Sequence, residues 1–236
     1  MARYLLFTLI FSTFLASSQN LEEDKIYFSD ALTLYLKDYN KKADAAIKNN
    51  EMELAHEYFD TLVKNHLQGT YLDKLSFNGY NTSLRDTDEF ERPVILLTYE
   101  SWCIPSEGEI PVLNKLAREY GDLMDFVVLF WDNKKTVRQK SRIFDKNITV
   151  IYVDEKVNEH MQTVSLLKHA MGLNLSFVIS ASHEILDINR RPPNYFNISY
   201  EDALAQNVSF ITEQVAAIYL DLNINPNELP ESLATF

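Results

Sequence analysis

The sequence predicts an α/β fold: a mixed central sheet with helices on both faces, preceded by a helical extension. Between residues 93 and 171, short apolar runs alternate with segments of helical period. Strands that alternate with helices form a largely parallel sheet that is buried on both faces. Two further strands are expected at 175–180 and 184–189, and the tight turn at Ser182-His183 between them adds an antiparallel edge.

The element boundaries follow from hydrophobic period and from turn residues. The apolar run at 93–99 predicts a buried strand, and Val112, Leu113 and Leu116 fall on one face of the helix expected at 106–120. The remaining strands are predicted at 125–131 and 148–153, and the remaining helices at 134–144, 156–171 and 200–222.

The segment that precedes this pattern is expected to be helical. Apolar stripes predict helices at 21–49 and 51–66, with Asn50 as the cap of the second and Gly69 beyond its end. Such stripes usually make core contacts, so the two helices are expected to pack on the domain that follows. A short hairpin is predicted next, because Asn78-Gly79 is a dipeptide favoured in hairpin turns.

Composition excludes one class of partner. With 46% hydrophobic and 12% aromatic residues, the 236-residue chain can bury a full core. Its 22 basic and 34 acidic residues give a formal charge of -12, which would repel a phosphate backbone. Nucleic-acid binding is therefore disfavoured.

The first residues have the pattern of an export signal. Arg3 precedes an apolar run at 4–16, and the small residues Ala16-Ser17-Ser18 suit a cleavage site. The run is shorter than the roughly 20 residues that span a bilayer. A cleaved signal peptide is expected, with a periplasmic or extracellular protein and no stable membrane insertion after cleavage; an uncleaved N-terminal anchor is the alternative.

The predicted organisation has four parts. It comprises a signal peptide at 1–18, a helical extension at 19–69, an α/β domain at 70–222 and a polar tail at 223–236.

Cys103 is the single cysteine of the chain, and it lies where the strand at 93–99 turns into a helix. The first turn of a helix offers unpaired N–H groups and the positive end of the dipole, and both favour a thiolate. An unpaired thiol in an exported protein implies a partner, a reaction or burial. A reactive sulfur is the first hypothesis, and burial is the alternative.

The residues around Cys103 resemble a known family. Residues 102–111 read WCIPSEGEIP, which is similar to the W-C-x-P-C-x-x-E-x-P motif of the TlpA-like envelope thiol-disulfide oxidoreductases of the thioredoxin superfamily. Every fixed position is retained except the second cysteine, which is Ser106. The resemblance covers about residues 67–222 and implies a thioredoxin-like fold.

The resemblance also implies a chemistry. In two-cysteine members the first thiolate attacks a disulfide and the second cysteine releases the product. The hydroxyl of Ser106 cannot take that second role, so release requires an outside thiol or another cysteine of the substrate. Thiol exchange, disulfide isomerisation or covalent capture through Cys103 remain open, with protein thiols or disulfides of the envelope as partners and no cofactor.

The same resemblance assigns further residues to the site. Glu109 matches the acid that TlpA-like proteins keep beside their cysteines, where it tunes the thiol; the alternative is a solvated acid or a helix-N-terminal acid that the dipole stabilises. The substrate groove is expected to involve Trp102, Ile104, Pro105 and Asn174.

Two positions depart from the family pattern. Asn174 stands where thioredoxins carry a cis-proline, so a trans peptide and an altered groove are expected. Leu97 stands where many thioredoxins hold a buried acid. Glu100 and Glu107 also lie near Cys103 in the sequence, and their carboxylates would raise the pKa of its thiol.

Metal binding is not expected. Cys103 has no second thiol, and the histidines show no paired ligand spacing beyond His160 and His169.

Two functions remain. The first is an exported thioredoxin-like protein that performs monothiol exchange or isomerisation through Cys103. The second is a redox-inactive thioredoxin-fold module that holds a protein partner with its groove and N-terminal helices; it is favoured by Ser106, Asn174 and Leu97.

Overall fold

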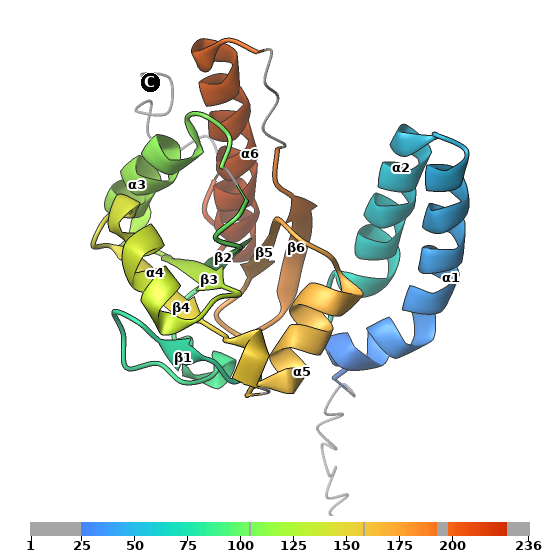
Figure 1. Cartoon of the computed structure of the whole chain (residues 1–236), viewed down its shortest axis with the longest axis horizontal. Helices are drawn as coiled ribbons and strands as arrows, with labels where there is room; N and C mark the ends of the chain where they lie inside the picture. The colour runs from blue at the N-terminus through green and yellow to red at the C-terminus, as the bar shows by residue number, and fades with distance from the viewer. Residues whose placement is uncertain (1–24, 104, 158, 193–197, 226–236) are drawn as a thin grey trace, which may run out of the picture.

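A computed structural model describes residues 25–103, 105–157, 159–192 and 198–225. The expected signal peptide at 1–18, the groove residue Ile104 and most of the predicted tail lie outside the described residues. A central sheet carries helices on both faces, and the helices α1 and α2 stand together at one side (Figure 1).

The sheet confirms the predicted arrangement. Its six strands have the order β1-β4-β3-β2-β5-β6. The strands β2, β3 and β4 are parallel to one another, β5 is antiparallel to β2, and β6 is antiparallel to β5, as expected for a thioredoxin-like α/β fold. These strands are β2 (Val94–Tyr99), β3 (Asp125–Phe130), β4 (Ile148–Tyr152), β5 (Leu175–Ile179) and β6 (Ile185–Arg190).

One face of the sheet is covered by the helices α3 (Glu109–Tyr120), α4 (Lys134–Lys140) and α6 (Tyr200–Asp221). Ile95 and Leu97 of β2 point into this layer, where they belong to one buried cluster with residues of all three helices. Leu97 therefore fills a core position, where an ionised acid would need a buried partner.

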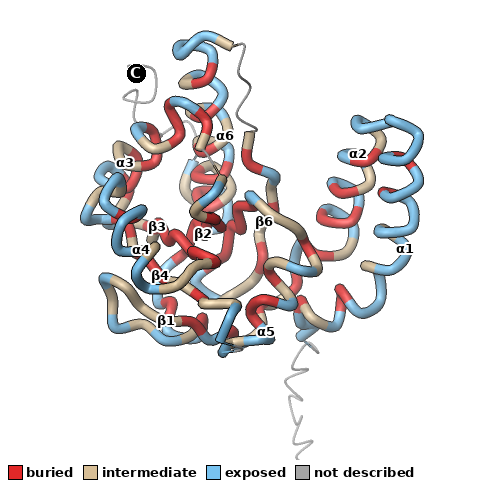
Figure 2. The backbone as a smooth tube through the Cα atoms, in the orientation of Figure 1, coloured by how far each residue is buried: buried red, intermediate tan, exposed pale blue. Residues whose placement is uncertain are grey.

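The opposite face carries α1 (Phe28–Lys48), α2 (Met52–Leu62) and two π-helical segments, Val63–Leu67 and Val164–Ala170. Val94 and Leu96 of β2 point this way and share a buried cluster with Phe28 and Phe59. The N-terminal helical pair thus packs on the domain, as predicted. Figure 2 shows buried residues on the inner sides of these helices and exposed ones on their outer sides.

The helix expected at 156–171 is broken into short pieces. They are a 3-10 turn at Glu155–Val157, a single α-turn α5 at Met161–Thr163 and then the second π-helical segment. Other 3-10 turns are Thr87–Glu89 and Ser141–Ile143.

The turn expected at Asn78-Gly79 is wrong, although an antiparallel bridge between Ser76 and Asp86 closes a wider loop around this dipeptide. These two residues form the edge strand β1 (Asn78–Gly79), which pairs antiparallel with β4. A Cβ at position 79 would lie 2.3 Å from the carbonyl oxygen of Thr82, so glycine serves a close backbone approach there. Asn-Gly is compatible both with a turn and with a close approach of the backbone of Thr82. Pairing with the edge of β4 favours the strand.

The predicted cap of α2 is also wrong. Glu51 precedes the helix and makes no side-chain cap, while Asn50 lies in the preceding turn with a φ of 62°. Gly69 does follow the end of the first π-helical segment, with a φ of +79°. Within the described residues, no helix is both long enough and apolar enough to cross a membrane.

Substitution of Phe28 tests whether α1 and α2 unfold together with the rest of the domain. Its ring is fully buried and meets Phe177 of β5 edge to face, with centroids 6.2 Å apart. Phe28→Ala is expected to lower the free energy of unfolding in urea by about 3–5 kcal/mol. Leu34→Ala is the matched control on the same helix, because Leu34 is 69% exposed, and it should change that free energy by less than about 0.5 kcal/mol. Equal effects of the two substitutions would contradict the packing described.

Candidate functional site

Cys103 lies in the loop between β2 and α3, beyond the carboxyl end of β2. Its N–H donates to the carbonyl oxygen of Glu100 at 3.0 Å, and its side chain is half-buried. The helix begins at Glu109 rather than at residue 106, so Cys103 lies well before its first turn. The expected support of a thiolate by the helix N-terminus is therefore wrong.

Gly108 explains the late start of α3. Its φ of +87° lies in the left-handed region, and a Cβ at this position would approach the Cα of Leu204 to 2.9 Å. Both the conformation and the contact with α6 favour glycine. The chain turns at Gly108 before it becomes helical, which separates Cys103 from the positive end of the dipole.

The surroundings of Cys103 include groups that raise the pKa of its thiol and groups that lower it. Burial raises the pKa of the Cys103 thiol, and a hydrogen bond from the Asn174 side chain lowers it. The Glu100 carboxylate raises the pKa, as the sequence suggested, whereas the cations Arg191 and Lys168 lower it. The pKa is raised overall, so the thiol is the predominant form at neutral pH.

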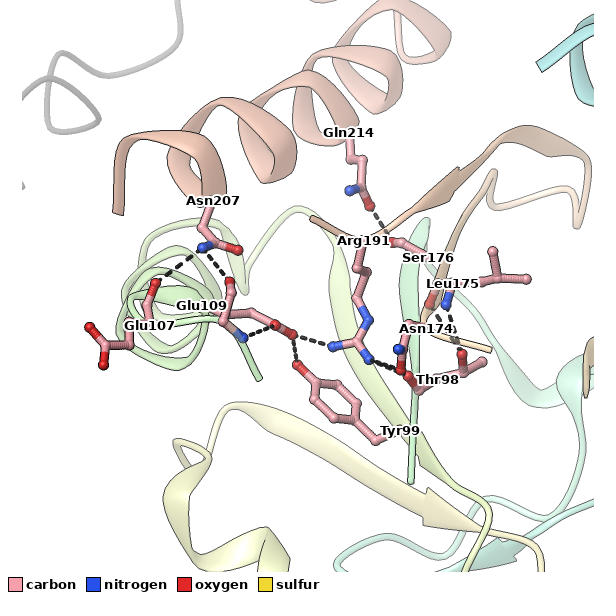
Figure 3. A network of polar contacts seen from close by, with 11 residues as sticks. Thr98, Tyr99, Glu107, Glu109, Asn174, Leu175, Ser176, Arg191, Asn207 and Gln214 are labelled. Atoms are coloured by element: carbon pink, nitrogen blue, oxygen red, sulfur yellow. Dashed lines mark hydrogen bonds and ion pairs between the residues drawn. The ribbon is translucent and has the colours of Figure 1, made fainter. Parts of the chain in front are cut away.

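The side chain of Ser106 makes a structural contact with α6. It is buried, and its Oγ accepts a hydrogen bond from Nδ2 of Asn207 on α6 at 2.7 Å. The same Asn207 amide donates to the carbonyl oxygen of Glu107 at 3.3 Å (Figure 3). It also donates to the carbonyl oxygen of Ala203 at 2.7 Å. Ser106 thus ties the loop to α6.

Glu109 is buried at the centre of a polar network (Figure 3). It forms an ion pair with Arg191 and accepts a hydrogen bond from the hydroxyl of Tyr99. Its other oxygen accepts from the N–H of Ser106 at 3.3 Å. Burial and the Glu109 carboxylate raise the pKa of Tyr99 well above its ordinary value, so the phenol stays protonated and donates. Glu109 is therefore not solvated, but it is the first residue of α3, as the helix-N-terminal alternative expects.

Arg191 joins this network to the other side of the loop. Its Nη2 donates to the carbonyl oxygen of Thr98 at 2.8 Å and to Oδ1 of Asn174 at 3.0 Å. The guanidinium also lies over the ring of Tyr99, 3.9 Å from its centroid. One buried cation therefore connects β2, the start of α3 and the residue before β5.

Sequence reasoning missed Arg191, which lies just beyond the last strand predicted at 184–189. The signal was the register of the last two strands. A tight turn at Ser182-His183 sets Leu175 opposite Arg190, as observed, and so brings Arg191 beside Asn174.

A second, partly buried group of charges also acts on Cys103. Lys168, from the second π-helical segment, pairs with both Glu100 and Glu155. Glu100 and Lys168 line an open cleft of about 350 Å³ together with Trp102 and Asp132. The cleft gives a partner access to the surface beside the cysteine loop.

The predicted groove residues differ in their exposure. Trp102 is 69% exposed, Pro105 is half-buried and Asn174 is exposed. Asn174 has a trans peptide bond, as expected, and a φ of 58°. The fold brings Asn174 to Cys103, whereas Ser106 and Glu109 make the contacts described above with Asn207 and Arg191.

No group of three or more His, Cys, Asp and Glu side chains in the described ranges is arranged to hold a metal ion.

No protein-family model and no curated protein matches this chain. Among the solved structures that it resembles, a secreted disulfide oxidoreductase of Mycobacterium tuberculosis, homologous to E. coli DsbE, is 12% identical, with a TM-score of 0.41 over 58% of this chain and 96% of that one. The thioredoxin domain of a thiol-disulfide oxidoreductase from Bacteroides vulgatus is 12% identical, with a TM-score of 0.42 over 61% and 96%. StoA from Bacillus subtilis is 14% identical, with a TM-score of 0.40 over 57% and 96%. The fold described above rests on the strand order and connections of this chain itself.

Removing the buried cation tests the network. Arg191→Met leaves the Glu109 carboxylate buried without its counter-charge, and it is expected to lower the free energy of unfolding by about 3–5 kcal/mol. Arg191→Met combined with Glu109→Gln removes both charges and should cost clearly less. Arg190→Met is the matched control, because Arg190 is exposed and its guanidinium donates to the hydroxyl of Tyr39 and lies over the ring of Phe59, away from Glu109. A double variant as unstable as the single one would show that the ion pair is not the cause.

Proposed function

We propose that this protein performs monothiol thiol-disulfide exchange or isomerisation through Cys103. The observation that carries the proposal is the placement of a half-buried cysteine beside two exposed side chains, Trp102 and Asn174. The Asn174 side chain lowers the pKa of the Cys103 thiol, which favours its anionic form. A partner protein can therefore reach the sulfur, and the loop offers it an aromatic surface to contact.

The proposed step conserves disulfide bonds and electrons. The Cys103 thiolate attacks one sulfur of a partner disulfide, the S–S bond breaks, and the other partner sulfur leaves as a thiolate that takes up a proton. The product is a mixed disulfide between the two proteins. A second thiolate of the partner then attacks the mixed disulfide, regenerates Cys103 and leaves the partner with a different disulfide.

The remaining site residues support this step in distinct ways. Ser106 has no resolving role and anchors the loop through Asn207. Glu109 holds the loop through the N–H of Ser106 and through Arg191, in place of the tuning role that the resemblance implies. Trp102 and Pro105 form the surface offered to the partner, and the predicted groove residue Ile104 lies outside the described residues. Export is proposed from the pattern of residues 1–18, with protein disulfides of the envelope as substrates and no cofactor.

One observation favours the second candidate, a binding module without redox activity. Burial raises the pKa of the Cys103 thiol, so a smaller fraction is anionic at neutral pH than in a free cysteine. In that case the exposed Trp102 and the cleft beside it would bind a partner without a covalent step.

The reaction of Cys103 with iodoacetamide across pH separates the two candidates. Because its pKa is raised, the rate in the folded protein should be lower at pH 7 than in the urea-unfolded chain, and it should keep rising above the ordinary thiol pKa of about 8.5. Cys103→Ser gives the background, since the chain has no other cysteine. Modification only after unfolding would contradict monothiol exchange.

Ser106→Cys tests the missing resolving thiol. In the unchanged protein, oxidised glutathione is expected to form a stable glutathione adduct on Cys103, which is detected by the mass of the intact protein. In Ser106→Cys the new thiolate should displace glutathione and form an internal disulfide, which lowers the adduct at least about tenfold because the attack is intramolecular. Ser141→Cys is the matched control: Ser141 is similarly buried, at 8% exposure against 6% for Ser106, but lies in the 3-10 turn after α4. Failure of the unchanged protein to form any adduct would refute the proposed exchange.

A further inference from the structure

We propose that the cleft beside Cys103 is a subsite for a basic side chain, so that the protein exchanges with disulfides that carry an arginine close to one of their cysteines. The inference rests on the proposed function and adds a substrate class to it. The cleft has a volume of about 350 Å³, at the small end of the range of about 300–1,000 Å³ that is usual for ligand sites. It can hold one long side chain.

Three parallel strands bring the lining residues of the cleft together. Residues 100–102 follow the end of β2, residues 131–133 follow β3, and residues 154–156 lie just beyond β4. Because these parallel strands end at the same edge of the sheet, the three segments meet there, and Lys168 of the second π-helical segment completes the lining. The crevice outside the carboxyl ends of parallel strands is a common place for ligands in α/β sheets.

The lining carries an excess of negative charge. Its charged residues are four acids and two lysines, namely Glu100, Asp132, Asp154, Glu155, Lys156 and Lys168. Lys168 pairs with two of the acids. The carboxylate of Asp132 instead accepts from the N–H and the hydroxyl of Ser101, at 2.8 and 2.6 Å, and that of Asp154 accepts from the N–H of Lys156 at 3.1 Å. These neutral donors orient the two carboxylates without neutralising them.

Two buried polar atoms of the lining residues are also unpaired. Glu100 and Trp131 are each 5% exposed, and within the described part of the chain neither Oε2 of Glu100 nor Nε1 of Trp131 has a hydrogen-bond partner. Buried polar atoms almost always have one, so an unpaired acceptor and an unpaired donor in the residues of one cleft point to a ligand that supplies both partners. A basic residue does so, since its cationic side chain donates and its main-chain carbonyl accepts.

Cys103 lies directly beside the cleft. Its N–H donates to the carbonyl oxygen of Glu100 at 3.0 Å, and its chain neighbour Trp102 is part of the lining. Adjacent Cα atoms are about 3.8 Å apart, and an extended chain advances about 3.3–3.6 Å for each residue. A residue close in sequence to the partner's cysteine can therefore enter the cleft while that cysteine meets the sulfur of Cys103.

An arginine suits this lining better than a neutral or acidic side chain. Its guanidinium is a planar fork of donors that matches carboxylate oxygens, and it also stacks on aromatic rings. Trp102, which is 69% exposed, offers such a ring at the cleft. The chain as a whole carries a formal charge of -12, so a basic partner is also attracted over longer distances.

The test compares three peptide disulfides that differ in one side chain. They are the symmetric dimers of acetyl-Cys-Gly-Arg amide and of the same peptide with citrulline or glutamate in place of arginine; citrulline has nearly the shape of arginine but no charge. The Cys103 thiolate attacks one sulfur, one peptide leaves as a thiolate that takes up a proton, and the other stays on the protein, where the mass of the intact protein reports it. With the whole folded chain at low salt, the arginine dimer is expected to react about threefold to tenfold faster than the citrulline dimer, and the glutamate dimer more slowly than both.

Charge-removing variants locate this preference in the molecule. Asp132→Asn combined with Asp154→Asn should bring the ratio of the arginine rate to the citrulline rate close to one, because both side chains lose their charge and keep an oxygen acceptor. Asp38→Asn combined with Asp44→Asn is the matched control, because it removes two charges from exposed positions of α1 outside the cleft, and it should keep the ratio. Since each ratio is taken within one protein, changes in the reactivity of the thiol cancel.

Two results would overturn the proposal. One is a ratio of one in the unchanged protein. The other is an equal fall of the ratio in both double variants, which would show that long-range charge alone selects the basic peptide.

The tryptophans allow a test that needs no exchange step. Trp102 and Trp131 are the two tryptophans of the chain, and both line the cleft, so tryptophan emission reports on it. In Cys103→Ser, acetyl-arginine amide is expected to give half of its change in emission at a concentration at least about threefold lower than acetyl-citrulline amide. Identical titrations would contradict a subsite for a basic side chain.

These measurements separate the subsite from the function. If no peptide forms a mixed disulfide on Cys103 while the emission titrations differ, the exchange function is wrong and the subsite stands. If all three peptides react at the same rate, the exchange function stands and the subsite is wrong.

Discussion

The buried ion pair between Arg191 and Glu109 is the interaction on which the cysteine loop depends. Both side chains are almost fully buried, and burying one of them alone would be strongly unfavourable. The pair can form only when the end of β6 and the first turn of α3 come together, so it requires the completed sheet. The conformation of the loop that carries Cys103 is therefore a property of the whole domain rather than of its local sequence.

The same pair gives the motif residue Glu109 a structural role. An acid beside a cysteine suggests proton transfer, yet the Glu109 carboxylate already accepts from Tyr99, Ser106 and Arg191. The serine that replaces the second cysteine is similarly engaged by Asn207. Two of the three motif positions that suggest catalysis have structural contacts, and Cys103 keeps the chemical one.

Hydrophobic period was sufficient to predict the sheet, its parallel core, its antiparallel edge and the packing of the N-terminal helices. It could not predict where α3 begins, because that depends on the contact of Gly108 with Leu204 on a helix about a hundred residues later. Asn78-Gly79 was misassigned for a similar reason, since its partner strand β4 lies far along the chain. Arg191 has no motif around it, and only the register of β5 against β6 places it at the site.

The position of the N-terminal helices has a consequence for biosynthesis. Phe28 packs against Phe177, and the face that α1 and α2 cover includes the strands β5 and β6. During translation these helices emerge long before the strands that they cover, so their apolar side stays without its partner until most of the chain has been made. A chain of this order cannot close its core while it is still growing. Its compact state is reached only after the late strands are released, which keeps the polypeptide unfolded for most of its synthesis.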